Sequence, residues 1–77
     1  MRKLLSVKPV DNYKLELTYD NNVKRLFDVK PYMKTGKFRE LEDKDKFNNV
    51  KVSFDTVAWV NGVDLCPDVL YDNSKQI

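Results

Sequence analysis

The stretch YKLELTY at residues 13–19 decides the fold, because its side chains alternate strictly between apolar and polar. Every odd-numbered position in it is apolar and every even-numbered position is polar. In an extended strand successive side chains point to opposite faces, so the four apolar side chains share one face. The stretch therefore predicts a β-strand with one buried face.

A hairpin is expected on the C-terminal side of this strand, where residues 23–29 form a second β-prone run. A three-residue turn at 20–22 places Leu15 opposite Phe27 and keeps the apolar side chains together. A two-residue turn would scatter them over both faces, so we favour the longer one. That turn needs a left-handed residue at its end, which Asn22 tolerates.

The N-terminal neighbour of the strand is expected at Leu4–Lys8, ended by Pro9, with a turn at 10–12. After the hairpin, Pro31–Gly36 predicts a loop or a single helical turn, with Gly36 as its stop. Apolar side chains at loosely helical spacing then predict two short helical turns within 38–47.

The last third of the chain contains another pair of β-prone runs, residues 50–54 and 56–60. Asn61-Gly62 is the strongest hairpin signal in the sequence, and we expect a three-residue loop that ends at Gly62. Pro67 suits the first position of a short helix over 68–71. Residues 73–77 are expected to be a frayed tail.

These elements predict one α+β domain over residues 1–77, with its core at about 4–72. We expect a small antiparallel sheet of four to five strands and one or two short helices. The order along the chain is three strands, a helical segment, two strands and a helix. Ten valines and one alanine agree with a sheet-rich fold.

Composition excludes several kinds of chemistry. The chain has no histidine and one cysteine, so a Ser-His-Asp triad, a Cys-His pair, a four-ligand zinc site and an internal disulfide are all ruled out. No apolar run is long enough to span a bilayer, and the N-terminus lacks the apolar core of a signal peptide. We therefore expect a cytoplasmic protein that is not an enzyme and has no cofactor and no membrane partner.

Two features near the C-terminus have both a chemical and a structural interpretation. Cys66 precedes a helix start, where a thiol can become reactive, but Asp64 and Asp68 beside it oppose ionisation, so we expect a buried structural cysteine. The carboxylates of Asp64, Asp68 and Asp72 could act as acids and bases, or bind Mg²⁺ or Ca²⁺, although the spacing of an EF-hand loop is absent. Capping and solvation explain them more simply.

A mildly basic middle leaves weak nucleic-acid binding, or an accessory role in transcription, as an alternative function. Residues 1–50 carry 12 basic and 8 acidic side chains, against 2 and 4 in residues 51–77. Acidic side chains interleave with the basic ones, and no glycine-rich phosphate loop exists, so nucleic acid is the less favoured partner. The candidate phosphate contacts are Lys24, Arg25, Lys34, Lys37 and Arg39.

The favoured function is a protein-interaction module that binds another small protein or a second copy of itself. Either Leu4-Leu5 or Val50–Val52 should lie near a sheet edge, where a partner strand can add. Tyr32, Met33 and Phe38 lie in loop-like sequence and are the candidate exposed anchors. Trp59 is expected to be a core anchor, the alternative being an exposed binding hot spot.

The closing run at residues 59–71 resembles the end of a bacterial family, the domain of unknown function 2442 family. Upstream stretches at 13–17, 27–32 and 36–41 are similar to that family in the same order. The resemblance implies a compact α+β domain with no established activity. It also implies a gene beside that of another small protein, a layout like that of toxin–antitoxin pairs. The residues of the closing run that carry the resemblance are Trp59, Asn61, Gly62, Asp64, Pro67, Asp68 and Tyr71.

Overall fold

A four-stranded antiparallel sheet and a separate two-stranded sheet form the fold, together with short helices, in the computed structural model of residues 3–77. The expected α+β class is confirmed. Met1 and Arg2, which enter the signal-peptide argument, lie outside the described residues. The elements in chain order are β1 (Leu4–Val10), β2 (Lys14–Tyr19), β3 (Lys24–Asp28), the 3-10 helices η1 (Lys30–Tyr32) and η2 (Gly36–Glu42), α1 (Lys44–Asn48), β4 (Lys51–Ser53), β5 (Thr56–Ala58), α2 (Pro67–Asp72) and β6 (Lys75–Gln76).

The first hairpin has the expected register. Leu15 lies opposite Phe27 in the β2–β3 ladder. The backbone N–H of Tyr19 donates to the carbonyl of Val23 at 3.0 Å, which closes the three-residue turn. Asn22 has a φ of 62°, the left-handed conformation that this turn requires.

The expected end of the first strand at Pro9 is wrong, because β1 continues to Val10 and Pro9 pairs with Leu15. The four-stranded sheet has the order β1-β2-β3-β6, so β1 is an edge strand. A proline without an N–H donor is tolerated there. The turn moves to residues 11–13 as a result.

The expectation of a frayed C-terminal tail is also wrong, because this tail forms the fourth strand of the larger sheet. Leu26 pairs with Lys75 in the β3–β6 ladder, and the N–H of Ile77 donates to the carbonyl of Lys24 at 2.9 Å. Ser74, which precedes β6, is buried. A strand of two residues has no hydrophobic periodicity, so no pattern in the sequence marks it.

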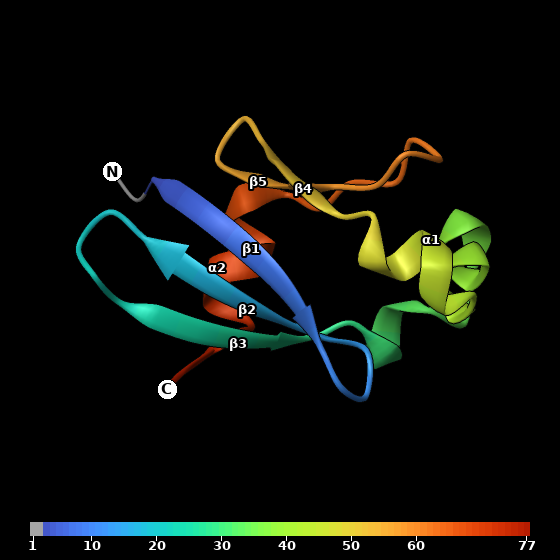
Figure 1. The fold of residues 1–77 in the computed structure, drawn as a ribbon, viewed down its shortest axis with the longest axis horizontal. Helices are drawn as coiled ribbons and strands as arrows, with labels where there is room; N and C mark the ends of the chain where they lie inside the picture. The colour runs from blue at the N-terminus through green and yellow to red at the C-terminus, as the bar shows by residue number, and fades with distance from the viewer. Residues whose placement is uncertain (1–2) are drawn as a thin grey trace.

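The two strands of the last third pair with each other rather than joining the larger sheet. β4 lies beside β1 and the β4–β5 hairpin stands over one end of the sheet, while α2 crosses behind it (Figure 1). β5 ends at Ala58 instead of continuing to Val60. The following turn is as expected, with Gly62 at a φ of 89° and the N–H of Trp59 donating to the carbonyl of Val63.

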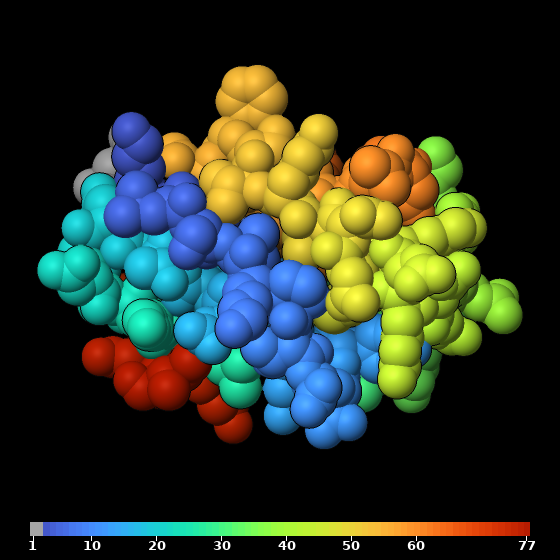
Figure 2. Space-filling model, viewed as in Figure 1, coloured from blue at the N-terminus to red at the C-terminus, as the bar shows by residue number. Residues whose placement is uncertain are grey.

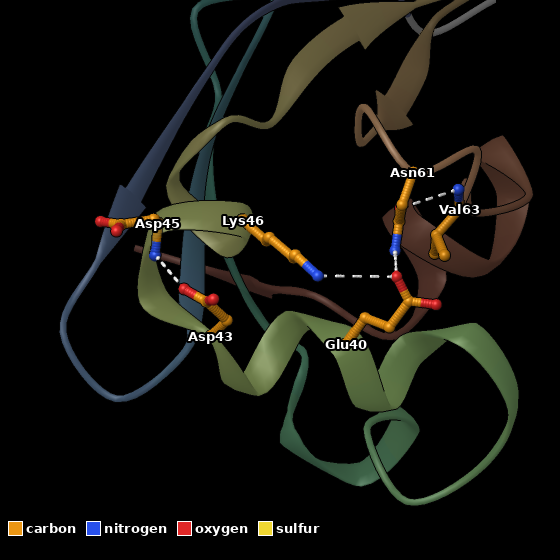
Figure 3. Close-up of polar contacts among 6 residues, drawn as sticks. All are labelled: Glu40, Asp43, Asp45, Lys46, Asn61 and Val63. Carbon is orange, nitrogen blue, oxygen red and sulfur yellow. Dashed lines mark hydrogen bonds and ion pairs between the residues drawn. The ribbon is translucent and has the colours of Figure 1, made fainter.

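The helical segment between β3 and β4 contains the two expected short turns, η2 and α1. Gly36, expected to stop a turn, instead begins η2 with a φ of 59°. Asp43 caps α1, since its side chain accepts a hydrogen bond from the N–H of Asp45 at 3.0 Å (Figure 3).

One apolar core joins all these layers. The large sheet contributes Leu15, Leu17 and Phe27, each almost fully buried. The small sheet contributes Val57, and α2 contributes Leu70. The sheet, the hairpin and the last helix therefore fold around the same interior.

Candidate functional site

Trp59 is a core anchor, as expected, with 2% of its surface exposed. Its ring nitrogen donates a hydrogen bond to the carbonyl of Phe47 at 2.9 Å. The rings of Phe38 and Phe47 both pack against it, each with its centroid 6.2 Å away. The tryptophan therefore fixes the second hairpin to the helical segment and is not available to a partner.

Asn61 and Gly62 have a structural part in the second turn. The side-chain oxygen of Asn61 accepts a hydrogen bond from the N–H of Val63 at 3.2 Å (Figure 3). Its amide nitrogen donates to the Glu40 carboxylate at 3.4 Å, which in turn lies 3.9 Å from the ammonium of Lys46. This polar chain connects the turn to η2 and α1.

Arg25 and Tyr71 hold the C-terminus of the chain. The guanidinium of Arg25 lies 4.1 Å from the centre of the Tyr71 ring, which packs edge-on against Tyr19. The same guanidinium donates to the Ser74 hydroxyl and to the Ser74 carbonyl, at 2.5 and 2.7 Å. Arg25, a candidate phosphate contact, is thus engaged within the chain.

The other basic candidates do not gather on one surface. Lys24 is exposed on β3, which begins at the end of the molecule that carries the 20–22 turn (Figure 1). Lys34, Lys37 and Arg39 are exposed in and beside η2, at the opposite end of the 32 Å long axis. The length of the molecule therefore separates Lys24 from the other three candidates.

The three loop anchors expected from the sequence are not free. Met33 is buried, with 5% of its surface exposed, so its interpretation as an exposed anchor is wrong. Tyr32 stacks on Phe27 at 5.5 Å between ring centroids, and Phe38 lies 6.2 Å beyond it. Tyr32 and Phe38 are half-buried extensions of the core.

Phe54 is the aromatic side chain that sequence reasoning missed. Alternation over 50–54 places it on the same strand face as Val50 and Val52, yet 94% of its surface is exposed. It lies in the turn between β4 and β5. The β4–β5 segment projects from the top of the molecule in Figure 2. The one sequence signal for a turn here is Asp55, a common turn residue, and it does not indicate that the strand ends before Phe54.

The backbone at this tip is strained. Phe54 has a φ of 51° and Asp55 a φ of 64°, so both central residues of the two-residue turn are left-handed. This is the type I′ geometry, which favours Asn and Gly. A left-handed conformation costs other residues about 1–2 kcal/mol each. An exposed phenyl ring offsets none of that cost.

The outer face of the same hairpin is hollowed next to Phe54. The depression has a volume of about 380 Å³. Three small residues of the hairpin, Ser53, Thr56 and Ala58, line it. Val57, between Thr56 and Ala58, points to the opposite face of the strand and is fully buried in the core. Cys66 lies on its wall and is exposed, so the expectation of a buried cysteine is wrong.

The strand edge at Leu4-Leu5 offers a partner little to pair with. β1 lies at the edge of the sheet, in line with the sequence analysis. However, its register shifts between Leu4 and Ser6, and Pro9 lacks a donor. The other candidate edge, β4, lies against β1. The hairpin tip is therefore a better candidate contact than either strand edge.

Comparison with known proteins gives one match. The model of the family described as "Protein of unknown function (DUF2442)" matches residues 4–76. The chain belongs to this family. No curated protein and no solved structure matched the chain.

The closing run of this DUF2442 chain forms the far side of the depression. Asp64, Leu65 and Pro67 line it opposite the hairpin tip, and the Thr56 hydroxyl donates to the Leu65 carbonyl at 2.7 Å. Asp68 is exposed in the first turn of α2. Within residues 3–77 no three His, Cys, Asp or Glu side chains cluster as metal ligands would, and no helix has the length and apolarity to cross a membrane.

Proposed function

We propose that this DUF2442 chain is a non-catalytic protein-interaction module. Its contact surface is the outer face of the β4–β5 hairpin, which we call the hairpin face: Phe54, the depression beside it and the 64–67 segment. The observation that carries the proposal is the 94% exposure of Phe54 in a left-handed turn conformation.

Folding of the isolated chain gives no reason for a phenylalanine at this position. Its ring makes no core contact, and its backbone conformation is unfavourable for the residue type. Burial of a phenylalanine side chain stabilises a complex by about 1.5–3 kcal/mol. A binding partner that covers Phe54 would therefore compensate for the local strain, and aromatic side chains are common anchors of protein interfaces.

The chemical groups beside the depression favour binding over catalysis. The depression is lined by one thiol, that of Cys66, and one carboxylate, that of Asp64, and the chain has no histidine to activate either. The family resemblance implies a gene for another small protein beside the gene of this chain. That neighbouring protein, bound in the manner of an antitoxin, and a second copy of the chain are the two candidate partners.

Site-specific photo-crosslinking in the producing cell tests this function. The photoreactive analogue p-benzoylphenylalanine replaces Phe54, and in a control chain it replaces Val60. Val60 is also apolar and exposed, at 71%, but lies in the other hairpin. We expect a discrete crosslinked product from position 54 and none from position 60, with the partner identified by mass spectrometry. No product from position 54, or equal products from both, would contradict the proposal.

A further inference from the structure

We infer that the partner on the hairpin face is a second copy of this chain, in which the Phe54 ring of each copy enters the depression of the other. This inference rests on the proposed function and specifies its partner. It is carried by three properties of the hairpin face: the size of the depression, the position of the ring beside it, and the charges that flank it.

The depression has room for the ring. An apolar cavity of about 150 Å³ accepts a benzene molecule, and the depression measures about 380 Å³. Its small hairpin residues leave space above them, and Leu65 and Pro67 give it apolar walls. Phe54 of the same copy is one of the residues that line this space, but its ring does not fill it, because 94% of its surface is exposed.

Ring and depression lie on one hairpin, so a single two-fold axis satisfies both. When Phe54 of one copy enters the depression of another, the second Phe54 is carried to the first depression by the same rotation. Such an interface is self-complementary and closes at two copies. An unrelated partner would have to supply a ring and a depression of its own to match both features.

The charges on the hairpin face are also self-complementary. Ala58 pairs with Lys51 on one side and bridges to Asp64 on the other. Directly paired residues share a face of a sheet, so Lys51 and Asp64 flank Ala58 on the outer face, and both are exposed. A partner of one charge sign would meet repulsion at one of them, whereas a second copy can pair Lys51 with Asp64 in both directions.

Sedimentation equilibrium of the full chain tests the inference. One hairpin face is at the small end of protein interfaces, so we expect a dissociation constant on the order of tens of micromolar. The matched variants are Phe54→Asn, which removes the ring but suits the turn, and Val60→Asn in the other hairpin. We expect Phe54→Asn to weaken dimerisation at least about tenfold and Val60→Asn to leave it unchanged.

Charge exchange provides a second, independent measurement. Lys51→Glu and Asp64→Lys should each weaken the dimer, and the double variant K51E/D64K should restore it. A double variant that is no stronger a dimer than either single variant overturns the charge pairing.

The failure of the inference is distinguishable from that of the function. A wild-type chain that stays monomeric at several hundred micromolar, or a Phe54→Asn dimer of unchanged strength, overturns the second-copy inference. If position 54 then crosslinks the neighbouring protein in cells, the interaction function stands with a different partner. If position 54 crosslinks nothing, both proposals fail.

Discussion

At position 54 the preference of the backbone and the use of the side chain conflict. A type I′ turn is most stable with Asn or Gly at its centre, and the structure places Phe54 there, with its ring in solvent. Residues that break a local rule without a packing gain tend to mark functional positions. If this conflict exists, replacing Phe54 by a residue that suits the turn increases the free energy of unfolding.

We expect Phe54→Asn to raise the free energy of unfolding of the monomer by about 1 kcal/mol, because Asn adopts the left-handed conformation at less cost. Urea denaturation at low protein concentration measures this change. Trp59, the one tryptophan, is buried and reports unfolding by its fluorescence. Val60→Asn is the control and should shift stability by less than about 0.5 kcal/mol. A clear loss of stability in Phe54→Asn would show that the ring supports the fold.

At the scale of elements, β6 is joined to the sheet by a side chain of β3 as well as by backbone pairing. Arg25 donates to both the hydroxyl and the carbonyl of Ser74, 49 residues later in the chain. The Ser74 hydroxyl in turn donates to the Tyr71 carbonyl at 2.7 Å, at the end of α2. The guanidinium of Arg25 thus connects β3 to the segment between the last helix and the last strand.

Deletion of residues 74–77 should lower the free energy of unfolding by about 3 kcal/mol, because it removes β6 and leaves the half-buried Arg25 without its oxygen acceptors. Thermal and urea denaturation measure the loss. Deletion of Ile77 alone is the matched control, since its side chain is exposed and only its N–H bonds to β3. Equal stability of the two truncated chains would show that β6 contributes little.

Local patterns predicted the parts of the fold whose partners are near in sequence. The alternation within 13–19, the left-handed Asn22 and the Asn61-Gly62 turn each specify their own geometry, and the structure has all three. The strand itself begins at Lys14, because Tyr13 is left-handed, with a φ of 58°, and belongs to the preceding turn. What failed depends on distant contacts. The role of β6 follows from Arg25, and the continuation of β1 through Pro9 follows from its place at the sheet edge.

The candidate site was the harder part to predict, because exposure is a tertiary property. Tyr32, Met33 and Phe38 lie in loop-like sequence but fill the side of the core. Phe54 continues the alternating pattern of the expected strand at 50–54. In the structure the turn begins at residue 54, within that expected strand, and Phe54 is exposed to solvent. The sequence drew attention to the closing run, but no pattern in it indicates the depression that Asp64, Leu65 and Pro67 form with the hairpin.

At the scale of the whole molecule, the separation of the basic residues bears on nucleic-acid binding. Nucleic-acid affinity arises largely from several cations that contact phosphates together. The exposed candidate phosphate contacts lie towards opposite ends of the long axis of the molecule, and Arg25 is engaged with Ser74. We therefore expect no complex with a 20-base-pair DNA duplex at tens of micromolar protein and low salt, measured by fluorescence anisotropy. Saturable binding that falls steeply with salt would reverse this expectation.

The irregular edge of β1 has a consequence for how large an assembly can become. Strands added edge to edge can extend without limit and produce fibres. The shifted register near Leu5 and the missing donor at Pro9 interrupt the regular row of backbone groups that such growth needs. At the opposite edge, β6 presents only two residues. Both edges of this sheet therefore work against unlimited growth by strand addition, which lowers the tendency of the chain to form fibres.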